Sequence, residues 1–262
     1  MKSKKGLFSV LLVLAVVACF IPAMKKEAKA GQYDYYLTFD SQGGHVDSAT
    51  GPSTKKVTLP QSYYACGTEC QKHTAYKEGY NFLGWYTAAS GGTKITSSYY
   101  GCPSRVYAHW ERKTYTVSYN ANGGSGAPAA QKKTHGVNLT LSSTKPSRTG
   151  YDFVGWSTSK NGAVAYSAGA AYKNNSSVTL YAVWRIKTYT ITICSSSNGG
   201  NAYTMTKVYG QSITIPATSA PAGQYLVGYG TSSSATDVAY CVGDVYSMNA
   251  NLVLFPIFRS ID

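Results

Sequence analysis

Four side chains in the first half of the chain could bind a metal ion or form disulfides: Cys66, Cys70, His73 and Cys102. Three of them fall in one stretch, "CGTECQKH", with three residues between the cysteines and two before the histidine. Thiolates and imidazoles are ligands that zinc prefers, so the set is a candidate zinc site. This spacing is uncommon among zinc sites, and exported thiols tend to oxidise. Disulfide chemistry is therefore the favoured expectation, with no metal or cofactor.

The N-terminal segment predicts that the chain is exported. Three lysines among the first five residues precede an apolar run over 7–24, and the small residues Ala28 and Ala30 follow it. This order is typical of a secretory signal peptide, which we expect to occupy residues 1–30. Two alternatives stay open: a retained membrane helix, and a lipoprotein site that leaves a lipidated Cys19. With the signal removed we expect no transmembrane segment and an extracellular or cell-surface location.

The charge of the exported chain favours anionic partners. Residues 1–30 hold six of the 24 basic and one of the 11 acidic side chains, so 18 and 10 remain, a net charge of +8. Such a balance favours anionic surfaces such as wall polymers, acidic glycans or nucleic acid, and the favoured alternative is a solvated basic surface without a specific partner. No run of five basic residues follows the signal, which argues against a nucleic-acid site. We expect the partner to be a cell-wall polymer, a glycan or another surface protein.

Three copies of one phrase organise the rest of the chain: "GYNFLGW" at 79–85, "GYDFVGW" at 150–156 and "GQYLVGY" at 223–229. The segments "VYAHW", "LYAVW" and "LFPIF" end at Trp110, Trp184 and Phe258, each 74 residues after the last. Internal periodicity of this kind predicts tandem repeats. We expect repeat 1 at 31–112 with a cysteine-containing insertion at 61–78, repeat 2 at 113–186, and an atypical terminal repeat 3 at 187–262, arranged as beads on a string.

Each repeat is expected to be mostly β. The chain has 24 tyrosines and few charges, and no stretch shows a helical period over three turns. The repeats open with alternating strands such as "YTVSY", and "ANGG" then predicts a tight turn with positive φ. The closing strands alternate too, and Pro256 should lie at a sheet edge or bulge because it cannot donate a hydrogen bond.

The repeated phrase predicts a strand with a β-bulge. Strict alternation would put Trp156 on the face opposite Phe153, whereas a bulge at Gly155 turns the indole back toward the core. The alternative is a surface platform of aromatic rings that binds sugars. The expected core motif of the three repeats comprises Tyr80, Phe82, Gly84, Trp85, Trp110, Tyr151, Phe153, Gly155, Trp156, Trp184, Leu226, Gly228, Tyr229 and Phe258.

These motifs in their order, "YTVSYNANGG", "GYDFVGW" and "VTLYAVW", resemble the Listeria–Bacteroides repeat and are similar to the B-repeat of internalin B. Repeat 2 matches over nearly its whole length, repeat 1 with its insertion and repeat 3 only weakly. The resemblance implies a compact α+β, β-grasp-like module on secreted or surface-displayed bacterial proteins, with roles in adhesion or spacing. It implies no catalytic residues.

Further cysteines and tyrosines are candidates for a bridge and a binding surface. Cys194 and Cys241 both stand where repeat 2 has another residue, which suggests that they pair. Five cysteines follow the signal, so one thiol stays free, pairs between chains, or indicates that Cys19 is retained. Paired tyrosines occur only in repeat 1, and the candidate glycan contacts are Tyr63, Tyr64, Tyr99 and Tyr100.

The sequence favours a non-enzymatic protein. Its four histidines are His45, His73, His109 and His135, and no nucleophile elbow, HExxH segment or phosphate loop accompanies them. We expect His109 and His135 to be partly exposed strand or turn residues. The favoured function is that of an exported surface, adhesion or spacer module. The alternative is a glycan- or wall-binding module that uses exposed tyrosines and positive charge, and a redox-active repeat 1 is a third reading.

Overall fold

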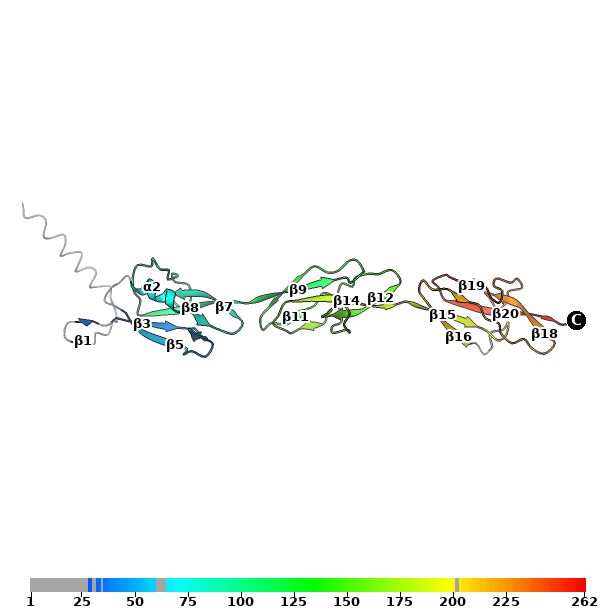
Figure 1. Ribbon diagram of the computed structural model, residues 1–262, viewed down its shortest axis with the longest axis horizontal. Coiled ribbons are helices and arrows are strands. Elements are labelled where there is room, and N and C mark those ends of the chain that lie inside the picture. The colour runs from blue at the N-terminus through cyan, green and yellow to red at the C-terminus, as the bar shows by residue number, and fades with distance from the viewer. Residues whose placement is uncertain (1–27, 30–31, 34, 60–64, 201–202) are drawn as a thin grey trace, which may run out of the picture. The chain divides into compact units, whose positions relative to one another are not determined.

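The computed structural model describes residues 28–29, 32–33, 35–59, 65–200 and 203–262 (Figure 1). The expected signal peptide up to residue 27, Cys19, Tyr63 and Tyr64 lie outside these residues. The chain forms two compact units. Unit 1 comprises the described residues up to Tyr115 together with Thr134–Val137, and unit 2 comprises Thr116–Lys133 and Asn138–Asp262. The boundaries of the three repeats stay a prediction.

Unit 1 contains one four-stranded sheet, in the order β5-β3-β8-β7, a short pair β4-β6 and a helix. The two-residue strands β1 (Ala28–Lys29) and β2 (Gln32–Tyr33) pair before it. The other elements of unit 1 are β3 (Tyr35–Asp40), β4 (His45–Val46), β5 (Thr54–Leu59), α2 (Ala65–Lys72), β6 (Ala75–Tyr76), β7 (Tyr80–Tyr86) and β8 (Arg105–Arg112).

Unit 2 repeats this sheet twice, as β10-β9-β14-β12 and β16-β15-β20-β18, each with a short pair, β11-β13 or β17-β19. The opening and closing strands are parallel neighbours at the centre of each sheet. The strands are β9 (Thr114–Asn120), β10 (Gln131–Thr134), β11 (Leu139–Thr140), β12 (Tyr151–Ser157), β13 (Ala171–Tyr172), β14 (Val178–Ile186), β15 (Thr188–Ile193), β16 (Tyr203–Val208), β17 (Ile213–Thr214), β18 (Gln224–Gly230), β19 (Val245–Tyr246) and β20 (Leu252–Ser260).

The mostly β fold, built of sheet modules in tandem, is confirmed, and each sheet has its own hydrophobic core. The alternation of the opening strands sends one face inward, with Leu37 and Phe39 buried in the first core and Ile191 and Ile193 in the third. The β-grasp likeness of these modules stays a prediction.

The bulge expected in the repeated phrase is confirmed in all three sheets. In the β12–β14 pair, Phe153 lies opposite Trp184 and Gly155 opposite Val183, so Val154 is the extra residue. The same shift occurs between Phe82 and Gly84, and between Leu226 and Gly228. A bulge reverses the facing of the residues that follow it. The aromatic residue at the end of the phrase therefore points into the core.

These aromatic residues are unavailable as a sugar platform, because Trp85, Trp156 and Tyr229 are all buried. The Trp156 ring packs edge-on against Phe153 at a centroid distance of 5.0 Å. The matching pair in repeat 1, Trp85 and Phe82, lies at 5.2 Å.

The expected tight turns adopt positive φ, with values of 48° at Asn122 and 88° at Gly123. The next glycine, Gly124, lies directly beneath the second tryptophan of the repeat. A Cβ atom there would come within 2.6 Å of the Trp184 ring and 2.4 Å of the Ser147 carbonyl oxygen. The Trp184 indole N–H also donates to the Ala121 carbonyl oxygen over 3.0 Å. The turn and the indole therefore fit together only without a side chain.

Pro256 lies at a local sheet edge, as expected. The parallel pairing of β20 with β15 ends at Leu254, whereas its pairing with β18 continues to Tyr229 opposite Pro256. The proline consequently removes no hydrogen bond from a central ladder.

Besides several two-residue strands, the sequence analysis missed three longer ones: β5, β10 and β16, the hairpin partners of the opening strands. Two of them bury a lysine, Lys133 and Lys207, each about 1% exposed. Lys133 Nζ donates to Asn175 Oδ1 over 3.0 Å, and Lys207 Nζ to Asn249 Oδ1 over 3.3 Å. Buried amines need such acceptors. At the corresponding register position, repeat 1 has the apolar Leu59.

Substitution of Gly124 by alanine is expected to destabilise unit 2 by about 1–3 kcal/mol, because the added methyl group overpacks the turn beneath Trp184. The free energy of unfolding is measured by urea denaturation followed by circular dichroism. The matched control is Gly200→Ala in repeat 3, where the atoms nearest to the added carbon are the hydroxyl oxygens of Ser195 and Ser196. Its effect should stay below about 0.5 kcal/mol. Equal effects of the two substitutions would show that the indole does not require the glycine.

Candidate functional site

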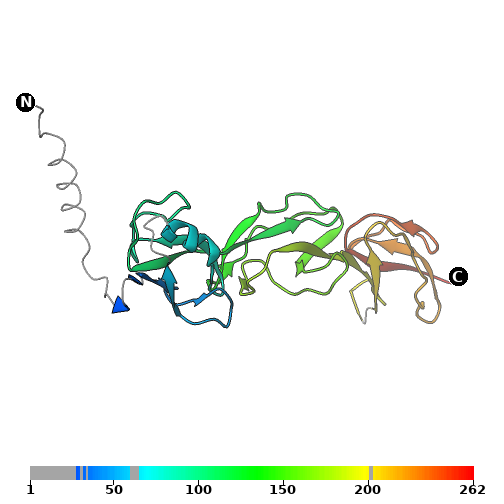
Figure 2. The ribbon, with the colours of Figure 1, turned by 60° about the vertical axis from the view of Figure 1, so that its left-hand side comes forward.

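The insertion of repeat 1 contains the helix α2, although the sequence analysis found no helical period in the chain. The helix packs on the first sheet (Figure 2). Its Cys66 and Cys70 are buried in the core of that sheet together with Leu37 and Phe39. The two cysteines are one turn apart and face the same side of the helix. Gly67 lets the helix approach closely, since a Cβ atom there would lie 2.4 Å from the Thr96 carbonyl oxygen.

Three of the four candidate ligands come together as thiols. Cys66 and Cys70 are buried in the first core, and the half-buried Cys102 packs against it, so the three thiols lie in one cluster. The Cys102 thiol lowers the pKa of Cys66, but the Cys70 thiol and burial outweigh it and raise the pKa to about 12. The Cys66 thiol, followed by burial, also raises the pKa of Cys102. All five described cysteines are free thiols in the structure.

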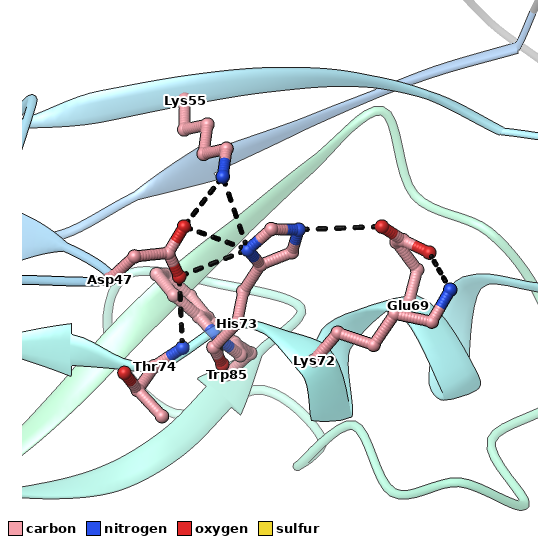
Figure 3. A network of polar contacts seen from close by, with 7 residues as sticks. All are labelled: Asp47, Lys55, Glu69, Lys72, His73, Thr74 and Trp85. Atoms are coloured by element: carbon pink, nitrogen blue, oxygen red, sulfur yellow. Dashed lines mark hydrogen bonds and ion pairs between the residues drawn. The ribbon is translucent and has the colours of Figure 1, made fainter.

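His73 binds carboxylates instead of joining the thiols as a ligand (Figure 3). Its Nδ1 lies 2.9 Å from both oxygens of Asp47, and its Nε2 lies 3.3 Å from Glu69 Oε1. An imidazole that carries both protons donates to both carboxylates in this arrangement. Among the described residues, no group of three or more His, Cys, Asp or Glu side chains has the arrangement of a metal site.

Two lysines complete this network. Lys55 Nζ lies 2.6 Å from Asp47 Oδ2, and Lys72 Nζ lies 2.8 Å from Glu69 Oε2. Burial raises the pKa of Asp47, but hydrogen bonds from Lys55 and His73 outweigh it, so the pKa is lowered. The pKa of Glu69 is lowered chiefly by its hydrogen bond with Lys72, and His73 adds to the effect.

The network joins elements that are far apart in the sequence. Asp47 follows β4, Lys55 lies on β5, Glu69 lies on α2, and His73 follows that helix. Trp85 of β7 adds a further contact, since its indole N–H donates to the His73 carbonyl oxygen over 2.8 Å. The sequence analysis missed Asp47 and Lys55, because no local spacing connects residues on separate elements. It also missed Glu69 and Lys72, although they lie four residues and one residue before His73.

This network of charged side chains is suited to holding the insertion in place and not to catalysis. A general base needs a ring nitrogen free to accept a proton from a substrate, and both nitrogens of His73 face carboxylate oxygens. A hollow of about 230 Å³ lies beside it, lined by residues that include His73, Trp85 and Lys94. This volume is below the usual range for small-molecule sites. We call Asp47, Lys55, Glu69, Lys72 and His73 the insertion clamp.

The other sequence candidates are spread over the structure. Tyr99 is half-buried against the first core, and burial raises its pKa, with Cys66 and Cys102 adding to the effect. Its neighbour Tyr100 is 77% exposed. In repeat 3, Cys194 is buried and Cys241 is exposed, and their pairing stays a prediction.

The remaining histidines lie on strands and turns. His109 and His135 are half-buried, as expected. The His109 ring stacks on Tyr86 at 3.8 Å, and His135 Nδ1 lies 3.0 Å from the Tyr115 hydroxyl. His45 Nδ1 lies 2.6 Å from the Gly51 carbonyl oxygen.

The sheet repeated in each module defines a class, the tandem-repeat proteins built of small β modules. The chain belongs to the Listeria-Bacteroides repeat domain family, whose model matches residues 35–108 and 115–183. The two matches correspond to repeats 1 and 2. The family membership of repeat 3 and the specific likeness to internalin B stay predictions.

The relatives include two named as membrane proteins and an internalin, and all three are much longer than the matched region. A protein of Evansella cellulosilytica named a Gly-rich membrane protein is 30% identical over 201 residues, which cover 74% of this chain and 22% of the relative. A second membrane protein of that organism is 28% identical over 86% of this chain and 33% of its own length. Internalin H of Listeria monocytogenes is 32% identical over 109 residues, 40% of this chain and 19% of its own. Within the described ranges, no helix has the length and apolar character needed to cross a membrane.

Trp85→Phe is expected to cost about 1 kcal/mol more than Trp156→Phe. Both substitutions remove the same atoms from a buried ring, but only Trp85 loses a hydrogen bond, and it leaves the His73 carbonyl without its donor. Trp156 is the natural control, because its buried Nε1 has no hydrogen-bond partner among the described residues. Scanning calorimetry of both variants measures the difference. A smaller cost for Trp85→Phe would show that the indole does not hold the insertion.

Acid should weaken unit 1 through the clamp. The pKa values of Asp47 and Glu69 are lowered in the fold, so both carboxylates stabilise it at pH values above their ordinary pKa values of 3.8 and 4.5. This stabilisation is lost as the pH falls through the lowered pKa values. Asp47→Asn removes one of them. The melting temperature of the variant should lie below that of the parent chain near pH 7, and the gap should narrow toward about pH 3. A gap that does not change with pH would contradict a stabilising role for the Asp47 charge.

Proposed function

We propose that the chain is a non-enzymatic, exported repeat protein of the bacterial surface, where it serves as an adhesion or spacer module. The observation that carries the proposal is the repetition of one sheet in three repeats, each with its own core. A module with its own core can be added in series without altering its neighbours. The membrane-protein names of the relatives from Evansella cellulosilytica and the internalin H match support a surface location.

Charge is the interaction that we propose for adhesion. With residues 1–30 removed the net charge is +8, and bacterial wall polymers are anionic. A weak contact made by three linked repeats gains strength by avidity when the spacing of sites on the polymer fits. The insertion clamp supports the non-enzymatic part of the proposal, because its charged side chains pair with one another and leave no free base among them.

A second candidate is glycan binding through Tyr100, which is favoured by its 77% exposed side chain in a protein with few exposed rings of that degree. Aromatic faces stack on the apolar faces of sugars, an interaction that salt does not screen. The two candidates therefore differ in their response to ionic strength.

The purified exported chain is expected to sediment with isolated cell wall of Listeria monocytogenes at about 0.05 M salt and to be released at about 1 M, where the screening length falls to about 3 Å. Tyr100→Ala should leave this binding unchanged. Binding that survives high salt and is lost in Tyr100→Ala would favour the glycan candidate instead. No sedimentation at either salt concentration would contradict wall adhesion.

A further inference from the structure

The three thiols of repeat 1 are arranged around Cys66. Cys66 shares the first core with Cys70 of its own helix, and Cys102, in the segment that precedes β8, packs against that core. Cys66 is the thiol that raises the pKa of Cys102, and both thiols raise the pKa of the nearby Tyr99. Cys66 and Cys70 are buried, whereas Cys102 is half-exposed. Over 113–200 and 203–262, the described residues of repeats 2 and 3, there is no counterpart of α2 or of this cluster.

We propose that Cys66 and Cys102 form a disulfide in the exported protein, which fastens the insertion helix to the segment before β8 and leaves Cys70 as a buried spare thiol. The proposal rests on the export inferred above, since disulfides persist in oxidising compartments. It selects one pairing from this cluster of three thiols.

Geometry favours Cys102 over Cys70 as the partner. Cys66 and Cys70 lie one turn apart on a helix, where all Cα–Cβ bonds tilt the same way and do not converge on each other as a disulfide needs. Cys102 approaches from a separate segment, 36 residues later in the chain. A cross-link over such a span restricts the unfolded chain far more than one between neighbouring helical turns.

Exposure favours the same choice. A bond between Cys66 and Cys70 would leave Cys102 as a half-exposed free thiol on an exported protein. The proposed bond leaves Cys70, which is about 1% exposed and therefore protected from reaction between chains. If Cys194 and Cys241 also pair, Cys70 is the odd cysteine among the five.

The oxidant that we name is a small-molecule disulfide or the disulfide of an exported thiol oxidoreductase. One thiolate attacks the external disulfide and expels one external thiol, and the second cysteine then displaces the other. Two cysteine thiols are oxidised and one external disulfide is reduced to two thiols. In the folded reduced protein the pKa of Cys66 is about 12, so the thiolate is scarce, and the bond should form before the thiols are buried.

The pairing is tested by refolding the reduced full chain in oxidised and reduced glutathione, then blocking free thiols and digesting without reductant. Trypsin combined with a protease that cleaves after glutamate separates Cys66 from Cys70 at Glu69. We expect the peptide with Cys66 to be linked to the peptide with Cys102, and Cys70 to be blocked. A Cys66–Cys70 link, or three blocked thiols, would overturn the proposal. Because the bond is formed in vitro, this failure would leave the surface function untouched.

Three serine variants give an independent readout. Reductant present during refolding should lower the melting temperature of unit 1 in the parent chain and in Cys70→Ser by roughly 10 °C. The same reductant should have no effect on Cys66→Ser or Cys102→Ser. Cys102→Ser alters a half-exposed side chain, so it decides the outcome even if Cys66→Ser fails to fold. Equal sensitivity of Cys102→Ser and the parent chain would contradict the pairing.

Discussion

One extra residue in the strand before each large aromatic side chain is the constraint on which the modules depend. The bulge at Val154 reverses the facing of the chain, so that Phe153 and Trp156 pack against each other from nearly adjacent positions. Without it, the largest side chain of the repeat would point to solvent, and a core of this size could not replace the lost apolar area. The glycine that follows the extra residue has no side chain and accepts the close approach of Val164.

The three modules share this framework but complete it with different chemistry. In repeat 1 the buried Trp85 indole N–H donates to the His73 carbonyl oxygen. In repeat 3 the buried Tyr229 hydroxyl donates to the Pro216 carbonyl oxygen over 2.7 Å. In repeat 2 the Trp156 indole N–H is buried without an acceptor among the described residues. Repeat 1 alone exchanges a buried lysine for a leucine, Leu59, and adds a helix. The backbone pattern therefore tolerates considerable variation in its polar contacts.

The sequence predicts the framework well, because periodicity and bulges act locally. The alternating strands and the facing of Trp156 follow from residues a few positions apart, and the 74-residue offset follows from comparing the copies along the chain. The strands β10 and β16 escaped the analysis, since their buried Lys133 and Lys207 are read as surface residues. The helix α2 was missed because it spans two turns, too few for a helical period to emerge. The insertion clamp depends on Asp47, whose distance from His73 along the chain carries no signal, so tertiary contacts alone reveal it.

The third core differs from the others in having Tyr229 and Phe258 where they have tryptophan. All four tryptophans of the chain therefore lie in the first two repeats. Tryptophan fluorescence therefore reports on these two repeats alone, and the last repeat contributes no fluorescence at wavelengths that excite tryptophan selectively. The chain carries a built-in optical label that distinguishes its terminal module from the two before it, so loss of the last sheet can be separated from loss of the others without any added dye.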